Sequence, residues 1–223
     1  MKTIFDLGFY DGQDAEFYMS KGYKVVAVEG DPKLMELGKE KFKTEIAEGK
    51  LLLLHRVLTD QKGLVEFYCS EEQPWRGNPY KHLAEYDGFP AKPEMVEAVS
   101  INKLCETWGV PCYIKMDIDA IEIAALKQIF ELKEKPQYLS VEIQSYAWAG
   151  IFSWVYACGY TKFQLRNQAN NTNVHNSGAF GEELPDKWIP MDEVMKRYVK
   201  FRELRDVDCE ELTIGSLNLH ATY

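Results

Sequence analysis

The chain has 223 residues, a length that fits one α/β domain able to bury a sheet between two layers of helices. Its formal net charge is −9, and lysine and arginine form no long cluster. This charge argues against a nucleic-acid substrate bound through its phosphates, so we expect a small-molecule or glycan partner.

The five cysteines are odd in number and form no C-x-x-C pair, a pattern typical of reduced thiols in a cytosolic protein. The amino terminus shows no charged-then-apolar leader, and no apolar run approaches the roughly 18 residues that a membrane helix needs. The sequence therefore predicts a cytoplasmic protein without a membrane span, and leaves its oligomeric state open.

Strands and helices are expected to alternate along most of the chain. The predicted strands are Ile4–Leu7, Lys24–Val28, Leu51–Leu58, Tyr113–Ile118, Tyr138–Ile143, Thr161–Arg166 and Ser216–Tyr223. The predicted helices are Ala15–Ser20, Pro32–Ala47, Ile121–Phe130, Phe152–Cys158 and Met191–Leu204. This alternation predicts an α/β fold of the Rossmann-like type, in which a seven-stranded, mostly parallel sheet ends in an antiparallel last strand.

The whole chain, residues 1–223, is expected to form a single domain with insertions at about 59–98 and 167–213. Within the first insertion, the segment from Ser70 to Glu94 combines prolines with Trp75, Tyr80 and Tyr86, which we expect to pack against one another. We expect Leu51–Leu58 to form a central strand with apolar residues on both faces.

The first strand and turn carry the pattern of a cofactor site. Asp6 ends an apolar strand, Gly8 and Gly12 follow, and Glu29 ends the next strand. Glycines let backbone amides approach a ligand, Asp6 suits the cationic amino-acid end of S-adenosylmethionine (SAM), and Glu29 suits its ribose hydroxyls. The spacing D-x-G-x-x-x-G, without G-x-G-x-x-G, argues against a nicotinamide dinucleotide.

We therefore predict SAM as the cofactor. Further cofactor contacts are expected from the turn residues Phe9, Tyr10 and Asp11, from Gly30, and from Asp117 on the fourth core strand. The adenine is expected to rest against Val57, Leu58 and Asp60, which come at and after the end of the third strand. Asp14 is expected to be the N-cap of the helix that begins at Ala15 rather than a ligand.

Polar residues alternate at the end of the fourth core strand, where apolar side chains are expected. The Asp117 carboxylate can accept a proton from an attacking hydroxyl, steer the SAM sulfonium, or join a divalent-metal site. Lys115 can hold a neighbouring carboxylate ionised or orient a substrate oxygen. Asp119 and Glu122 fit this site and, equally well, the capping of the following helix.

Two further groups complete the predicted catalytic set. Glu142 ends the next strand and is either a second acid–base or metal group or a partner of Lys115. His175 lies in a polar loop whose length without apolar periodicity predicts a lid or substrate loop. There it is either a general base or a solvated surface group. Because Lys115 already supplies a neutralising charge, we expect no obligatory metal.

The sequence resembles the FkbM family of SAM-dependent methyltransferases over nearly its whole length. The resemblance rests on the runs around Phe5-Asp6-Leu-Gly8, Val26-Ala-Val-Glu29, Ile114-Lys115-Met-Asp117, Val141-Glu142-Ile143, Ser177-Gly178-Ala-Phe180 and Leu217-Asn-Leu-His220. It implies a class I methyltransferase fold, SAM as methyl donor, and O-methylation of a hydroxyl, often on a sugar or polyketide. Two other functions stay open: a nicotinamide-dependent oxidoreductase or epimerase, and a catalytically silent SAM-binding module.

Overall fold

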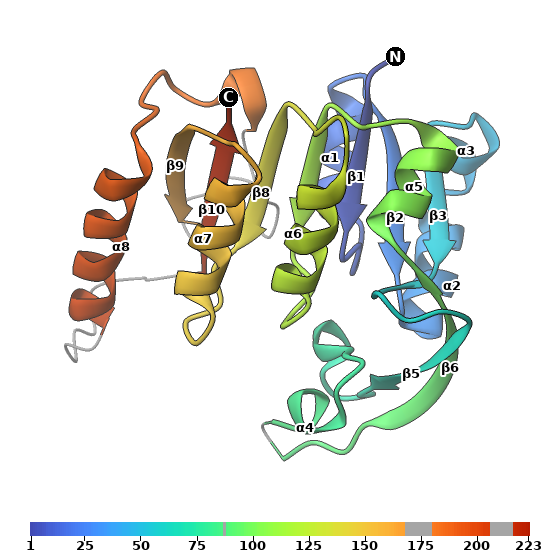
Figure 1. The fold of residues 1–223 in the computed structure, drawn as a ribbon. Coiled ribbons are helices and arrows are strands. Elements are labelled where there is room, and N and C mark those ends of the chain that lie inside the picture. Colours follow the sequence, from blue (N-terminus) through green and yellow to red (C-terminus); the bar gives the residue numbers. More distant parts are fainter. Residues whose placement is uncertain (87, 168–179, 206–215) are drawn as a thin grey trace.

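The computed structural model describes residues 1–86, 88–167, 180–205 and 216–223, and it contains two sheets (Figure 1). The main sheet has seven strands in the order β3-β2-β1-β7-β8-β10-β9. Its strands are β1 (Thr3–Leu7), β2 (Lys24–Glu29), β3 (Leu51–His55), β7 (Tyr113–Met116), β8 (Tyr138–Glu142), β9 (Lys162–Asn167) and β10 (Leu217–Thr222). Only β10 runs antiparallel to its neighbours, β8 and β9, so the predicted architecture of the sheet is confirmed.

Helices cover both faces of this sheet (Figure 1). The helices are α1 (Gln13–Ser20), α2 (Pro32–Lys41), α3 (Lys43–Ala47), α4 (Lys81–Ala84), α5 (Ile101–Trp108), α6 (Glu122–Glu131), α7 (Trp148–Ala157) and α8 (Met191–Arg205). The larger core packs α5, α6, α7 and α8 against side chains such as Phe5 and Ile114. The opposite face packs Tyr18 of α1 and Phe180 against Ile4 and Tyr113.

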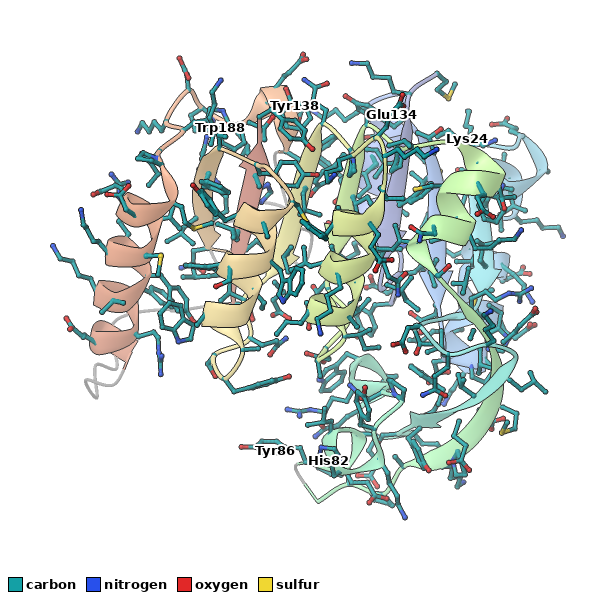
Figure 2. All side chains as sticks on the ribbon, in the orientation of Figure 1. Lys24, His82, Tyr86, Glu134, Tyr138 and Trp188 are labelled. Atoms are coloured by element: carbon teal, nitrogen blue, oxygen red, sulfur yellow. The ribbon has the colours of Figure 1, made fainter. Side chains whose placement is uncertain are left out.

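The second sheet belongs to a small lobe beyond the carboxyl ends of the main strands (Figure 1). Its strands are β4 (Val57–Leu58), β5 (Leu64–Cys69) and β6 (Lys92–Val99), and the lobe also contains α4 and a short 3-10 helix at Pro74–Arg76. Figure 2 shows His82 and Tyr86 on this lobe, at the opposite end of the molecule from Lys24 and Tyr138.

Two predicted elements are divided in the structure. The expected strand Leu51–Leu58 separates into β3, an edge strand of the main sheet, and β4, which pairs with β6 in the lobe. Between them, the Arg56 amide still donates to the Glu29 carbonyl of β2 at 2.9 Å, and from Val57 on the chain pairs with β6. The expected helix Pro32–Ala47 breaks at Phe42, but its predicted start is confirmed because Asp31 Oδ1 accepts from the Lys33 and Leu34 amides.

The aromatic side chains of the lobe are not packed against one another as expected. Trp75, Tyr80 and Tyr86 are 54%, 50% and 75% exposed, because the lobe buries mainly Val65, Phe67 and Val96 instead. Among the described residues, four cysteines have free thiols, and no helix combines the length and hydropathy that crossing a membrane would require.

Candidate functional site

A cavity of about 580 Å³ opens at the carboxyl ends of β2, β1, β7 and β8, where the lobe faces the main sheet. Ligands of open α/β sheets bind at this edge, and the volume lies within the usual range for small-molecule sites. Its walls come from the turn after β1, the end of β2, the β3–β4 junction, the 3-10 turn of the lobe, the turn after β7, the end of β8, and Ser216.

The turn after β1 requires glycine at two positions for different reasons. Gly8 has φ of +88°, and a Cβ there would lie 1.9 Å from the Asp117 carbonyl oxygen, so the turn packs directly on the end of β7. The Gly8 and Phe9 amides both donate to the Val28 carbonyl at 3.2 Å. Gly12 has φ of +77°, and a Cβ there would meet the rings of Phe42 and Phe9. Gly8 thus shapes the cavity floor, whereas Gly12, which does not line the cavity, permits packing beneath it.

Glu29 occupies the tip of β2, where its carboxylate is held by two backbone amides. Its Oε2 accepts from Tyr10 N at 2.9 Å, and its Oε1 accepts from Asp31 N at 2.8 Å. Burial raises the pKa of Glu29 to about 6, although these amides oppose the rise. A carboxylate has about four acceptor positions, so the two amides leave room for hydroxyl donors from the cavity.

Lys115 on β7 lies beneath the glycine turn, almost fully buried. Its Nζ donates to the Gly8 carbonyl at 2.6 Å and lies 3.2 Å from Asp6 Oδ1 and 3.5 Å from Asp14 Oδ2. Burial alone would lower the pKa of Lys115, but the carboxylates of Asp6 and Asp14 raise it above its ordinary value. The lysine therefore carries a charge compensated by both carboxylates, and it connects β1, β7 and α1 under the cavity.

Asp6 is fully buried and does not line the cavity. It pairs with Lys115 in the register of β1 and β7, so the two side chains point to the same face of the sheet. Burial raises the pKa of Asp6 to about 7 against the opposing effect of Lys115. Asp14 was expected to be an N-cap, which is wrong: α1 begins at Gln13 with Gly12 as its N-cap, and the Asp14 side chain lines the cavity.

The carboxyl groups of Asp117, Asp119 and Glu142 line the cavity at the ends of β7 and β8. Gln144 Nε2 donates to Asp119 Oδ1 and to Glu142 Oε2, each at 2.7 Å, and thereby bridges the turn after β7 to the end of β8. Burial and the nearby Asp117 raise the pKa of Asp119 to about 6. The same two causes raise the pKa of Glu142 well above its ordinary value. Both groups can accept hydrogen bonds, and Asp119 can exchange a proton near pH 6.

The lobe closes the cavity on a third side. Asn78, which is buried, donates from Nδ2 to the Asp119 carbonyl at 2.9 Å and thus fixes the lobe to the turn after β7. Trp75 and Arg76 line the cavity next to this anchor. Near the end of β2, Val57, Leu58 and Phe67 form an apolar wall, and a Cβ on Gly30 would meet the Phe67 ring at 2.7 Å.

The structure brings most of the predicted site residues to one cavity. Those that line it are Gly8, Phe9, Tyr10, Asp11, Glu29, Gly30, Val57, Leu58, Lys115, Asp117, Asp119 and Glu142. Asp6, Gly12 and the exposed Asp60 do not line it, and His175 falls outside the described residues. Of the catalytic candidates, Lys115 lines the cavity and contacts Gly8, Asp6 and Asp14.

Sequence reasoning missed the roles of Asp14, Gln144 and Arg76 as cavity residues. A signal existed for Asp14, because the helix after a glycine turn starts at the carboxyl edge of the sheet. Gln144 follows Glu142 by two positions, but a loop residue gives no period from which its direction can be read. Arg76 lies in an insertion whose placement the sequence does not specify. Within the described ranges, no group of three or more His, Cys, Asp or Glu side chains is arranged to hold a metal ion.

No protein-family model matches this sequence, and no curated protein matches it. Among solved structures, the chain is similar to the C-terminal domain of precorrin-6Y C5,15-methyltransferase from Rhodobacter capsulatus, with a TM-score of 0.50 and 7% identity over 100% of this chain and 80% of that one. It also aligns with an O-methyltransferase from Bacillus cereus in complex with SAH, at a TM-score of 0.47 and 8% identity, covering 100% of this chain and 74% of that one. An rRNA methylase from Streptococcus thermophilus gives a TM-score of 0.48 at 8% identity, covering 99% and 86%.

The first of these likenesses, together with the strand order, identifies the fold as that of class I SAM-dependent methyltransferases. The fold class expected from the sequence is therefore confirmed. A likeness at 7% identity concerns the fold alone, and the chemistry has to be argued from the cavity itself.

Proposed function

We propose that this protein is a SAM-dependent methyltransferase that transfers a methyl group to a hydroxyl of a small molecule or glycan, as its resemblance to the FkbM family implies. The observation that carries the proposal is Glu29, a carboxylate fixed by two backbone amides at the tip of β2 and facing the same cavity as the glycine turn. This arrangement fits a ribose bearing two free hydroxyls.

The residues of the cavity fit each part of SAM. Glu29 has acceptor positions for the ribose, and Val57, Leu58 and Phe67 offer an apolar wall for the adenine. Carboxylates near Lys115 match the cationic amino-acid end. Gly8 lines the cavity, and its lack of a side chain lets the turn pack on the Asp117 backbone. Bound in this way, SAM supplies an electrophilic methyl group for an in-line displacement.

The protein's own residues have two tasks in this reaction. They hold the acceptor oxygen in line with the methyl carbon, which is where most of the rate gain of a displacement arises. They also receive the hydroxyl proton, for which Asp117 and Asp119 are the proposed groups, with Glu142 beside them. His175 stays a candidate base from the sequence alone.

The acceptor side of the cavity favours a neutral, hydroxyl-rich molecule. Trp75, which is about half exposed, lines the same cavity as the carboxyl and amide groups of Asp119, Glu142 and Gln144. An aromatic face with several hydrogen-bonding groups suits a polar ring system. The net charge of −9 opposes binding of a polyanionic nucleic acid.

Calorimetry with SAM, with its product S-adenosylhomocysteine (SAH) and with NAD tests the cofactor. We expect SAM and SAH to bind, whereas tight binding of NAD alone would favour an oxidoreductase or epimerase. The acceptor is then identified by incubating the protein with methyl-labelled SAM and a fractionated host extract. Label in a hydroxyl-derived methyl ether supports the proposal, and SAM binding without transfer into any fraction would instead fit a silent SAM-binding module.

Two further comparisons test the mechanism. Asp117→Asn keeps the shape of the side chain but removes its charge, so we expect methyl transfer to fall by more than SAH affinity does. Unchanged transfer in this variant would remove the role assigned to Asp117. We also expect transfer to persist in EDTA; loss of transfer that Mg²⁺ restores would establish a metal requirement.

A further inference from the structure

Asp6 was the sequence's candidate for the amino-acid end of SAM, but its carboxylate is fully buried against Lys115 and does not reach the cavity. Asp14 shares the same lysine and does line the cavity. We propose that Asp14, rather than Asp6, is the carboxylate that binds the cationic amino group of SAM. This inference rests on the proposed function and adds a binding residue to it.

The contacts of Lys115 make Asp14 suitable for a cation. The Lys115 ammonium is 2.6 Å from the Gly8 carbonyl, 3.2 Å from Asp6 and 3.5 Å from Asp14. Its charge is therefore compensated within the protein, so it does not leave a bare positive charge in front of an incoming ammonium group. Lys115 also holds the Asp14 side chain in place, so little conformational freedom remains to be lost on binding.

The position of Asp14 matches the direction in which the cofactor would extend. Glu29 is at the end of β2, and β1 lies between β2 and β7 in the sheet. A nucleoside anchored at Glu29 therefore directs its amino-acid end across the turn of β1 toward β7. Asp14 belongs to the first turn of α1, which directly follows that β1 turn, and it contacts Lys115 on β7.

The other carboxylates of the cavity are held by contacts elsewhere in it, whereas Asp14 is held next to Lys115. Glu29 accepts two backbone amides at the nucleoside end. Asp11 accepts from the backbone and the side chain of Gln13. Asp119 and Glu142 share the amide of Gln144 at the acceptor end. Asp117 also lines the cavity, and the experiment below includes it as the alternative.

A pair of ligands isolates this contact. SAH carries the amino-acid group, whereas 5′-methylthioadenosine has the same nucleoside and thioether without it. Calorimetry on both ligands gives an affinity ratio for each variant, and that ratio reports on the amino-acid end alone. A general loss of packing around the cavity would lower both affinities and leave the ratio unchanged.

In Asp14→Asn we expect SAH to bind roughly 10–100-fold more weakly, because one charge-assisted hydrogen bond is lost. The affinity for 5′-methylthioadenosine should stay within about twofold of the wild-type value. The matched control is Glu16→Gln on the same helix, whose side chain is 62% exposed and pairs with Lys41, and which should change neither affinity. Asp6→Asn serves as the second variant: it removes one of the two carboxylates beside Lys115 but not the proposed contact, so it should lower the ratio by less than Asp14→Asn does.

If Asp14→Asn weakens the affinities for SAH and 5′-methylthioadenosine equally, the inference is wrong. If Asp117→Asn weakens SAH binding alone and Asp14→Asn does not, the role belongs to Asp117. A wild-type protein that binds both ligands with a ratio near one would also overturn it. Binding of neither ligand by the wild type would instead refute the proposed function, and the inference with it.

Discussion

Replacing Gly8 by alanine tests the close approach between the cofactor turn and the end of β7. Gly8 has φ of +88°, a conformation that costs an L-residue about 1–2 kcal/mol. The new Cβ would also lie 1.9 Å from the Asp117 carbonyl oxygen, a backbone atom that cannot rotate away. Overpacking of this kind adds about 1–3 kcal/mol. We therefore expect Gly8→Ala to lower the free energy of unfolding by about 2–5 kcal/mol.

Gly22 provides a matched control for the backbone strain. It has φ of +83°, but a Cβ there would meet nothing within 4 Å, so Gly22→Ala carries the strain without the overlap. Urea unfolding of both variants measures the difference, and SAH calorimetry measures the effect on the cavity. Gly8→Ala should be the less stable by at least about 1 kcal/mol and should bind SAH at least about tenfold more weakly. Equal stabilities, with SAH affinity preserved, would refute the assigned packing.

The remaining predictions concern two buried glutamates. Glu29→Ala removes the acceptor for the ribose hydroxyls, so the binding free energy of SAH in calorimetry should weaken by about 1–3 kcal/mol. The control Glu36→Ala, at an exposed position, should leave SAH affinity unchanged. Wild-type SAH affinity in Glu29→Ala would exclude the ribose contact. Glu122 is buried with Oε1 unpartnered within the described structure, and burial raises its pKa to about 8, so the folded state favours its protonated form. Its contribution to stability therefore declines as pH rises from about 4.5 to about 8, and Glu122→Gln should match wild type near pH 4 but exceed its unfolding free energy above pH 8, by at most about 4–5 kcal/mol. A stability difference independent of pH would contradict this assignment.

The parts of the fold that could be predicted depend on local periodicity and local turn chemistry. Alternating strands and helices indicated the parallel sheet, and the short alternating strand at the end of the chain indicated the antiparallel β10. Asp31 before Pro32 predicted the start of α2, because the capping oxygen and the amides it accepts from lie within three residues. The Gly8 turn was predictable for the same reason.

What could not be predicted depends on which segments become neighbours. In the run Leu51–Leu58, His55 and Arg56 interrupt the apolar residues, but nothing in the sequence says that the first half pairs with β2 and the second half with β6. Asp6 looked like a ligand because it precedes the glycine turn, yet β7 lies beside β1 and places Lys115 opposite it. Two opposite charges far apart in sequence thus form a buried pair, and of the two carboxylates beside Lys115 it is Asp14, eight positions later, that lines the cavity.

The acceptor end of the cavity leads to a prediction about the pH dependence of transfer. Burial and Asp117 raise the pKa of Asp119 to about 6, while the same causes keep Glu142 protonated to higher pH than an ordinary glutamate. If Asp119 helps to receive the acceptor proton, methyl transfer should increase as pH rises through about 6, where Asp119 loses its own proton.

Two variants separate the carboxyls in this profile. Asp119→Asn should lower transfer and abolish the rise near pH 6, and asparagine tolerates the backbone φ of +30° at this position. Glu142→Gln resembles the protonated glutamic acid, so it should keep the rise. Initial rates of label transfer between pH 5 and 8 measure both. If the rise survives in Asp119→Asn and disappears in Glu142→Gln, Glu142 and not Asp119 receives the proton. Gln144, which donates to both carboxyls, would then stabilise the ionised form of Glu142 rather than that of Asp119.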